Sequence, residues 1–307
     1  MPKCQAGASS HNAPYLTSAN RSLAILAGSA FVSLSGDAIA GLGVPWLVLT
    51  TTHSAAKTGV VALCTMAPTV FGAFFGGAVI DRVAPRLVTV TSDLACCITV
   101  GVITLLQLAG TLRFWELCAL MAAAGLLHAP GDAARMVMMP ALAKDAQIPL
   151  PRAAGFYAGS SRAASALGAA AGGLIVVTLG VAQTLLIDAA TFAVSAVLIL
   201  LGVRLPRMVR RPGTRRSRAG RQWSRELGDG VRLIARTPIL TGIRVIGTIT
   251  AVSLAATPLG ALAAGLLITR WGLATTTLAF GGVYLAVTLA PVRFPVYKQM
   301  SVNQLGS

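Results

Sequence analysis

The chain has 307 residues, of which 55% are hydrophobic and only 11% are charged. Because soluble domains carry about 25% charged residues, this composition excludes an ordinary soluble protein and indicates an integral membrane protein. The formal net charge of +16 would suit nucleic acid, but much of the basic charge gathers in one segment beside an apolar run. That distribution favours contact with anionic lipid over nucleic acid.

Six apolar segments in the first part of the chain are long enough to cross a bilayer, since a spanning helix needs about 20 apolar residues. The runs are continuous rather than alternating, which predicts helices and not a barrel of strands. The predicted helices are Leu23–Leu49, Thr58–Ile80, Leu87–Leu108, Trp115–Arg135, Ala153–Leu179 and Ala182–Val203. Residues 1–22 are a predicted tail, and residues 23–203 are a predicted unit of six helices.

The connections between these helices alternate in basic charge. Arg82 and Arg86 lie between the second and third helices, and Lys144 and Arg152 lie between the fourth and fifth. The opposite connections carry little net charge. Lys and Arg are enriched in cytoplasmic connections, so the sequence predicts a multi-pass protein of the cell membrane with its amino terminus in the cytoplasm.

Residues 204–237 form a predicted cytoplasmic linker. Its first part holds a run of basic residues without an acid: Arg204, Arg207, Arg210, Arg211, Arg215, Arg216, Arg218 and Arg221. Its second part, Trp223–Thr237, places apolar residues three to four positions apart, which predicts an amphipathic helix at the membrane surface. We expect this linker to bind anionic lipid.

Residues 238–292 are expected to form two more helices, Val245–Ile268 and Leu273–Val292, followed by a tail at 293–307. The predicted fold is therefore an all-α transmembrane bundle of about eight helices. An even number of spans returns the carboxyl terminus to the cytoplasm, so both termini are expected on that side.

The connection after the second helix has the pattern G-x-x-x-D-R-x-x-x-R, at Gly77, Asp81, Arg82 and Arg86. A glycine allows close helix packing, an aspartate can face the positive end of another helix, and the arginines hold the turn in the cytoplasm. The pattern resembles the signature loop of the major facilitator superfamily, although Ala84 stands where that family usually has glycine.

Two longer stretches resemble the macrolide-efflux and enterobactin-exporter branch of this family: "SLSGDAIAGLGVPWLVLTTTHSAAKTGVV" and "LIDAATFAVSAVLILLGVRLP". The fifth helix contains "ALGAAAGGLI", which is similar to the family's antiporter motif at Gly168, Gly172 and Gly173, with Ala169 in place of a proline. The resemblance implies gradient-driven efflux of small amphipathic molecules such as drugs or siderophores.

The chain departs from the family after the linker. Family members have two halves of six helices around a central site, whereas about four helices of the second half are missing here. We interpret this as an internal deletion near Leu240–Gly242. Alternatives to transport are therefore a truncated, non-transporting relative, or a membrane subunit whose linker recruits lipid or a partner. Assembly into a homo-oligomer could complete the cavity. The resemblance also suggests that Asp81 docks near Arg244.

Charged residues inside the predicted helices should have a partner or a function, because each costs roughly 2.5–3.5 kcal/mol at the bilayer centre. Asp37 in the first helix is the candidate acid for ion coupling. A second group, read as a structural or gating network, consists of Asp93, Asp132, Arg135 and Arg162. Asp132 and Arg135 can pair within one helix, and Arg162 could reach Asp93 or Asp132 from the fifth helix.

Two further polar residues, His128 and Asp188, are expected to be packed and structural. The cysteines form no C-x-x-C pair, so they are interpreted as core residues. The sequence contains no P-loop, no H-E-x-x-H and no G-x-S-x-G. We therefore predict that the protein is not an enzyme and has no catalytic residues, metal site or cofactor.

Overall fold

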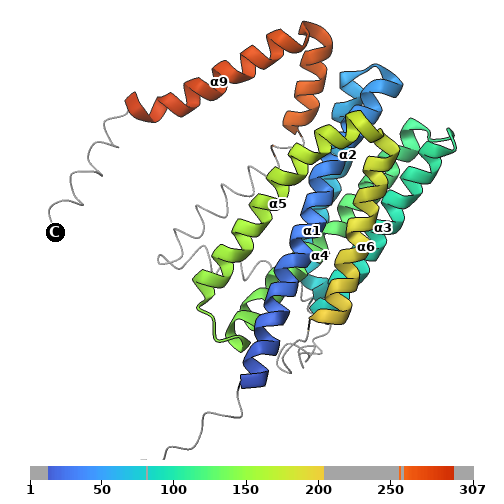
Figure 1. Cartoon of the computed structure of the whole chain (residues 1–307). Coiled ribbons are helices and arrows are strands. Elements are labelled where there is room, and N and C mark those ends of the chain that lie inside the picture. The colour runs from blue at the N-terminus through green and yellow to red at the C-terminus, as the bar shows by residue number, and fades with distance from the viewer. Residues whose placement is uncertain (1–12, 81, 204–255, 257–258, 294–307) are drawn as a thin grey trace, which may run out of the picture.

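The computed structural model describes residues 13–80, 82–203, 256 and 259–293. Helices joined by short turns account for these residues, and no strand occurs among them (Figure 1). The helices of the main bundle are α1 (Ala13–Thr52), α2 (Ala55–Ile80), α3 (Pro85–Leu108), α4 (Phe114–Asp145), α5 (Leu150–Leu179) and α6 (Val181–Gly202). A helix at Leu259–Trp271 and α9 (Leu273–Arg293) follow.

The described part of the chain contains 6 helices that are long and apolar enough to cross a membrane. This confirms the predicted all-α bundle and its first six spans. Two bounds of these six helices differ from the prediction by ten residues, and the others differ by no more than three. The helix α1 begins at Ala13, inside the segment predicted as a tail. The helix α4 continues to Asp145 through Pro140, because its last turns remain packed in the bundle although the sequence there is less uniformly apolar.

Apart from the contact between α3 and α4, the main contacts of the bundle join helices that are not neighbours in the sequence. The helix α1 lies against α5 and α6, α2 lies against α4, and α3 lies between α4 and α6. Glycines allow the α2–α4 approach, since a Cβ atom added at Gly72 would lie 2.5 Å from the Leu126 carbonyl oxygen. A Cβ atom added at Gly76 would lie 3.2 Å from Pro130 Cα. Small residues at helix interfaces are the usual means of close packing in membranes.

The interior has an apolar cluster at each end and a polar layer between them. The first cluster lies near the α2–α3 turn and includes Leu26, Met138 and Ile199. The second lies toward the α1–α2 connection and includes Val48 and Ile103. The layer between them contains buried charged and hydroxyl side chains from α3, α4 and α6. Charges buried at this depth are costly unless they are paired.

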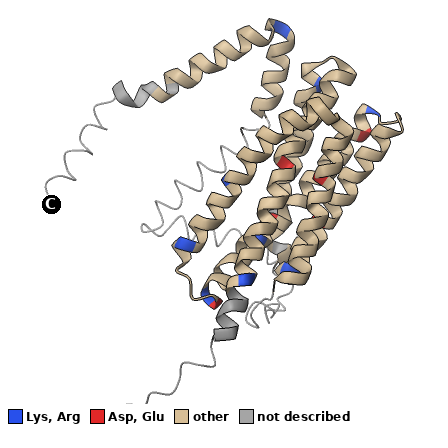
Figure 2. Cartoon of the chain, in the orientation of Figure 1, with Lys and Arg blue, Asp and Glu red and all other residues tan. Residues whose placement is uncertain are grey.

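The outer surface of the bundle is strongly apolar. Leu174, Val177 and Leu201 are 67%, 79% and 78% exposed. The described Lys and Arg residues lie mainly toward the two ends of the bundle, as the blue segments of the ribbon in Figure 2 show. An apolar belt between charged ends is the distribution expected of helices that face lipid.

The helix Leu259–Trp271 contacts the start of α2. A Cβ atom added at Gly265 would lie 2.6 Å from the Ala55 carbonyl oxygen, so this is a close glycine contact. The helices Leu259–Trp271 and α9 fall where two late helices were predicted. The predicted linker and amphipathic helix at 204–237, and the beginning of the predicted helix Val245–Ile268, lie outside the described residues.

Candidate functional site

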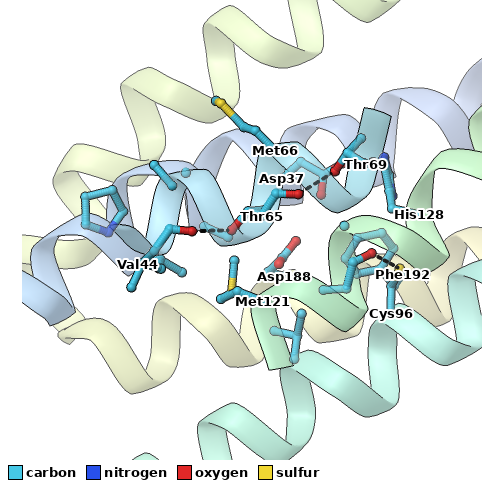
Figure 3. A pocket seen from close by; sticks show the side chains of 18 of the residues that line it. Asp37, Val44, Thr65, Met66, Thr69, Cys96, Met121, His128, Asp188 and Phe192 are labelled. Atoms are coloured by element: carbon cyan, nitrogen blue, oxygen red, sulfur yellow. Dashed lines mark hydrogen bonds and ion pairs between the residues drawn. The ribbon is translucent and has the colours of Figure 1, made fainter. Parts of the chain in front are cut away.

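The bundle contains a partly open cavity of about 370 Å³ between α1, α2, α3, α4 and α6 (Figure 3). Its volume lies within the range of about 300–1,000 Å³ that is usual for small-molecule sites. The lining residues are Asp37, Ala40, Gly41, Val44, Pro45, Thr58, Val61, Ala62, Thr65, Met66, Thr69, Cys96, Val100, Met121, Ala124, Gly125, His128, Asp188 and Phe192.

Small residues on three helices leave the space for this cavity: Ala40 and Gly41 on α1, Ala62 on α2, and Ala124 on α4. The threonines of the α2 wall have their hydroxyl groups engaged. Thr65 Oγ1 donates to the Val61 carbonyl at 3.0 Å, and Thr69 Oγ1 donates to the Thr65 carbonyl at 2.8 Å. The wall is therefore largely apolar in character, and the carboxyl and imidazole groups are its main polar features.

Asp37 of α1 and His128 of α4 contact each other at the cavity wall. His128 Nε2 lies 3.6 Å from Asp37 Oδ2 and 2.9 Å from Asp132 Oδ2 one turn further along α4. The His128 ring also contacts the Phe192 ring edge to face, with 5.7 Å between centroids. The imidazole is thus fixed between two acids, one on the cavity wall and one toward the polar layer.

The polar layer is centred on Arg135 of α4. The Arg135 and Asp93 side chains are each 1% exposed, and Nη2 lies 2.7 Å from Asp93 Oδ1. Ser195 of α6 donates to Asp93 Oδ2 at 2.7 Å and accepts from Arg135 Nη2 at 3.0 Å. Arg135 Nη1 donates to Asp132 Oδ1 at 2.8 Å. Three helices are joined by these bonds.

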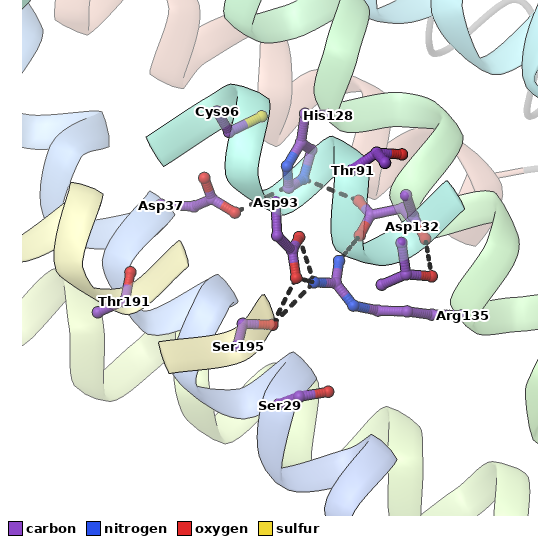
Figure 4. Close-up of polar contacts among 12 residues, drawn as sticks. Ser29, Asp37, Thr91, Asp93, Cys96, His128, Asp132, Arg135, Thr191 and Ser195 are labelled. Carbon is purple, nitrogen blue, oxygen red and sulfur yellow. Dashed lines mark hydrogen bonds and ion pairs between the residues drawn. The ribbon is translucent and has the colours of Figure 1, made fainter. Parts of the chain in front are cut away.

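The two groups form one continuous polar network (Figure 4). Its order is Asp37, His128, Asp132, Arg135, Asp93 and Ser195, with contacts between each neighbouring pair. Asp132 is the link, since it contacts His128 with one carboxylate oxygen and Arg135 with the other. The network therefore connects the cavity wall to the buried core of the bundle.

The predicted network also contained Arg162, and the structure does not bring this residue to the others. Arg162 is exposed on α5 and forms no ion pair with any acid in the described ranges. The residues of α5 that are buried include Ala164, Gly168 and Gly172. Arg162 lies about 200° around the helix from Ala164, since each residue turns about 100°, and so it points away from the bundle.

The signature loop is described only in part. Arg82 is exposed, and Arg86 donates from Nη2 to the Leu200 carbonyl at the end of α6. Within the described residues Gly77 forms no close helix contact, because a Cβ atom there would meet nothing within 4 Å. Gly72 and Gly76 serve this purpose instead. Asp81 and Arg244, the predicted docking pair, lie outside the described residues.

The glycine motif on α5 lies against α1. A Cβ atom added at Gly168 would lie 2.5 Å from the Ser35 carbonyl oxygen, and one at Gly172 would lie 2.9 Å from Ile39 Cα. Gly173 has open space on this side. Two of the three motif glycines therefore fit α5 closely to the cavity-lining helix α1.

Residues 26–246 of the chain match the sequence profile of the Major Facilitator Superfamily. The chain belongs to the major facilitator superfamily. This confirms the family, the transmembrane bundle and the prediction of a transporter-family protein rather than an enzyme. The cavity and its network are therefore candidates for a substrate path in this superfamily member. The described residues contain no group of three or more His, Cys, Asp or Glu that could hold a metal.

Several curated members of the superfamily are similar to the chain. The "Multidrug efflux pump Tap" of Mycobacterium tuberculosis (strain ATCC 25618 / H37Rv) is 30% identical over 188 residues, which is 59% of this chain and 45% of the relative. The protein of the same name from Mycolicibacterium fortuitum is 27% identical over 227 residues, which is 73% of this chain and 54% of the relative. The chain thus spans about half the length of the curated relatives it matches. No solved structure was found to match the chain.

Three residues of the site were not recognised as functional candidates from the sequence. His128 and Asp188 were expected to be structural, yet both line the cavity of this superfamily member. Ser195 was not considered, although it bonds both members of the buried ion pair. The spacing of Asp188 and Phe192 on α6 could have indicated a shared face, because residues four apart lie together on a helix.

The glycine packing makes a testable prediction. Gly168→Ala should lower the free energy of unfolding by about 1–3 kcal/mol, because the new methyl group would press on the α1 backbone. The matched change Gly173→Ala adds a methyl group to open space and should alter stability by no more than about 0.5 kcal/mol. Thermal unfolding of the two detergent-solubilised variants measures the difference, and equal melting temperatures would contradict the α1–α5 contact.

Proposed function

We propose that this chain exports small amphipathic molecules across the cell membrane, driven by an ion gradient. The observation that carries the proposal is the cavity, which combines a largely apolar wall with an acid–imidazole pair linked to a buried charge network. Apolar walls with a few polar groups suit amphipathic ligands. The name of the mycobacterial relatives, "Multidrug efflux pump Tap", agrees with this substrate class.

Asp37 is the acid that we propose for coupling. Its carboxylate lies on the cavity wall, and its ion partner within the described residues is His128 at 3.6 Å. Because His128 also contacts Asp132 at 2.9 Å, a proton or cation that neutralises Asp37 would leave the imidazole with Asp132. Ionisable residues inside a membrane bundle commonly mark ion or substrate paths. The coupled change would then pass along the network toward Arg135.

The proposed orientation has both termini in the cytoplasm. Arg82, Arg86, Lys144 and Arg152 lie at one end of the bundle, and the positive-inside rule supports placing that end in the cytoplasm. The basic linker would then meet the anionic inner leaflet. Assembly with a second copy, and docking of Asp81 near Arg244, remain predictions of the sequence.

Efflux of ethidium from cells that lack their own major exporters tests the proposal. Cells expressing the full chain should lose ethidium fluorescence several-fold faster than cells with the empty vector, and a protonophore should abolish the difference. Ala62→Phe places a ring in the cavity and should block this efflux. Val177→Phe places the same ring on the lipid-facing surface, where the side chain is 79% exposed, and should preserve it.

Efflux by the wild type and by the two variants distinguishes a transporter from a non-transporting relative. Expression of the two variants at wild-type levels is measured in the same membranes by immunoblotting. If the wild-type chain gives no energy-dependent efflux although it is present in the membrane, the chain is a non-transporting relative under these conditions and the proposal fails. If Ala62→Phe exports as fast as the wild type, the cavity is not the substrate path.

A further inference from the structure

The α6 wall of the cavity contains a carboxyl group that the network leaves unpaired. Asp188 is 3% exposed, and its Oδ1 atom is buried without a hydrogen-bond partner. The nearby Thr191 hydroxyl donates instead to the Asp188 backbone carbonyl, at 2.7 Å. A buried carboxylate without a partner is costly, since neither water nor a cation compensates its charge.

None of the cationic side chains described at the site forms an ion pair with Asp188. Within the described ranges, no Lys, Arg or His nitrogen lies within 4.0 Å of the Asp188 carboxylate. His128, the cation-forming side chain of the cavity, contacts Asp37 and Asp132. Arg135 is held by Asp93 and Asp132. The cavity therefore contains one acid in an ion pair, Asp37, whose Oδ2 atom also lacks a hydrogen bond, and one acid without an ion pair, Asp188.

The surroundings of Asp188 suit an organic cation. Asp188 and Phe192 are one turn apart on α6, and both line the cavity (Figure 3). An aromatic ring beside a carboxylate can bind a cation through its face while the carboxylate supplies the opposite charge. Met66 and Met121 line the same cavity, and thioether side chains adapt to ligands of different shape.

Tight packing leaves little room for Asp188 to turn away from the cavity. The α1 helix passes directly beside it, and a Cβ atom added at Gly36 would lie 2.7 Å from Asp188 Oδ1. The same Cβ atom would lie even closer to Thr191 Oγ1, so glycine at this position leaves space for both α6 side chains beside α1. The carboxyl group is held between two packed helices, and its Oδ1 atom has no hydrogen-bond partner.

We infer that the α6 wall binds the positively charged group of an amphipathic organic cation, with Asp188 as the opposite charge and Phe192 as the aromatic contact. This assignment rests on the proposed function and specifies its substrate class. It gives Asp37 and Asp188 different roles: Asp37 interacts with His128 and the network, whereas Asp188 interacts with the ligand. Neutral ligands of the same shape would lack the interaction with Asp188.

Equilibrium dialysis of the purified full chain in detergent tests the assignment without requiring transport. The probes are tetraphenylphosphonium, a cation, and triphenylphosphine oxide, a neutral molecule of similar shape, with protein-free micelles as the blank. The wild-type chain should prefer the cation. Asp188→Asn should weaken cation binding at least tenfold and change binding of the neutral probe less than threefold. Asp188→Glu should retain the preference for the cation.

Two control variants show which acid is responsible. Asp145→Asn removes a charge from the exposed end of α4 and should leave binding of both probes unchanged. Asp37→Asn should reduce cation binding less than Asp188→Asn does. If Asp37→Asn removes the cation preference and Asp188→Asn does not, the assignment is overturned. It is also overturned if the wild-type chain shows no preference for the cation.

Labelling of the wild-type chain provides a measurement that does not depend on the folding of a variant. Dicyclohexylcarbodiimide modifies carboxyl groups in apolar surroundings, and peptide mass spectrometry identifies the site. Tetraphenylphosphonium should protect Asp188 from modification, whereas triphenylphosphine oxide should not. Equal modification with and without the cation would overturn the assignment. The chain could bind the cation in an Asp188-dependent manner and yet give no efflux. That result would support the assignment and contradict the proposed transport.

Discussion

The Arg135→Met variant is expected to lose about 3–5 kcal/mol of folding free energy, because it leaves the buried Asp93 carboxylate without its cation. Both side chains are 1% exposed, so water cannot replace the missing partner. Native proteins are stable by only about 5–15 kcal/mol, and much of the variant should therefore be misfolded. Thermal unfolding and size-exclusion chromatography of the detergent-solubilised protein measure the loss.

The network supplies its own controls for this experiment. Arg162→Met removes an exposed arginine without an ion pair in the described part of the chain, and should leave the melting temperature nearly unchanged. The double variant Arg135→Met with Asp93→Asn should be more stable than Arg135→Met alone, because the lone buried charge is removed. If Arg135→Met has the same melting temperature as the wild type, the ion pair does not stabilise the bundle.

The membrane spans were predictable because the bilayer imposes one simple requirement. Backbone polar groups in lipid must be satisfied within a helix or a closed barrel, and the continuous apolar runs of α3 and α6 fit helices and not alternating barrel strands. Ends of helices were less predictable, as at α4, which continues past Pro140 to Asp145. Hydropathy falls in this segment, but the segment still packs against neighbouring helices. The local composition does not predict that packing.

The charge network was predictable within one helix and less so between helices. Asp132 and Arg135 are three residues apart, and this spacing alone brings them together. The prediction that Arg162 reaches Asp93 or Asp132 was not met, because the depth of a residue in the membrane does not determine which way its side chain faces. The buried positions Ala164 and Gly168 on α5 mark the face toward α1, and Arg162 lies on the other side.

The roles of Asp188 and His128 depend on contacts that no local pattern contains. The helix α6 lies mainly against α1 and α3 rather than against its sequence neighbour α5. A lone acid on an apolar helix can face any of these partners or lipid. The cavity itself arises from small residues on helices distant in sequence, such as Ala40 and Ala124, so its shape appears only when the helices are placed together.

The Asp37→Asn variant is expected to slow protonophore-sensitive ethidium efflux at least tenfold while the chain still folds. Asparagine keeps the size of the side chain and its oxygen acceptor, but it carries no charge to interact with His128 at 3.6 Å. An amide cannot exchange a proton or bind a coupling cation as a carboxylate does. Binding of triphenylphosphine oxide should change less than threefold, since the apolar walls remain intact.

Efflux and binding measurements together distinguish ion coupling from ligand binding, because Asp37→Asn and Asp188→Asn should each lose a different property. Asp37→Asn should bind a neutral ligand but export its substrates at least tenfold more slowly, whereas Asp188→Asn should lose mainly its preference for cations. Asp145→Asn, an exposed acid at the end of α4, should export ethidium at the wild-type rate. Wild-type efflux by Asp37→Asn would remove this residue from the mechanism. The gradient would then have to act through the buried groups around Arg135, where Asp93 and Ser195 have no contact with the cavity.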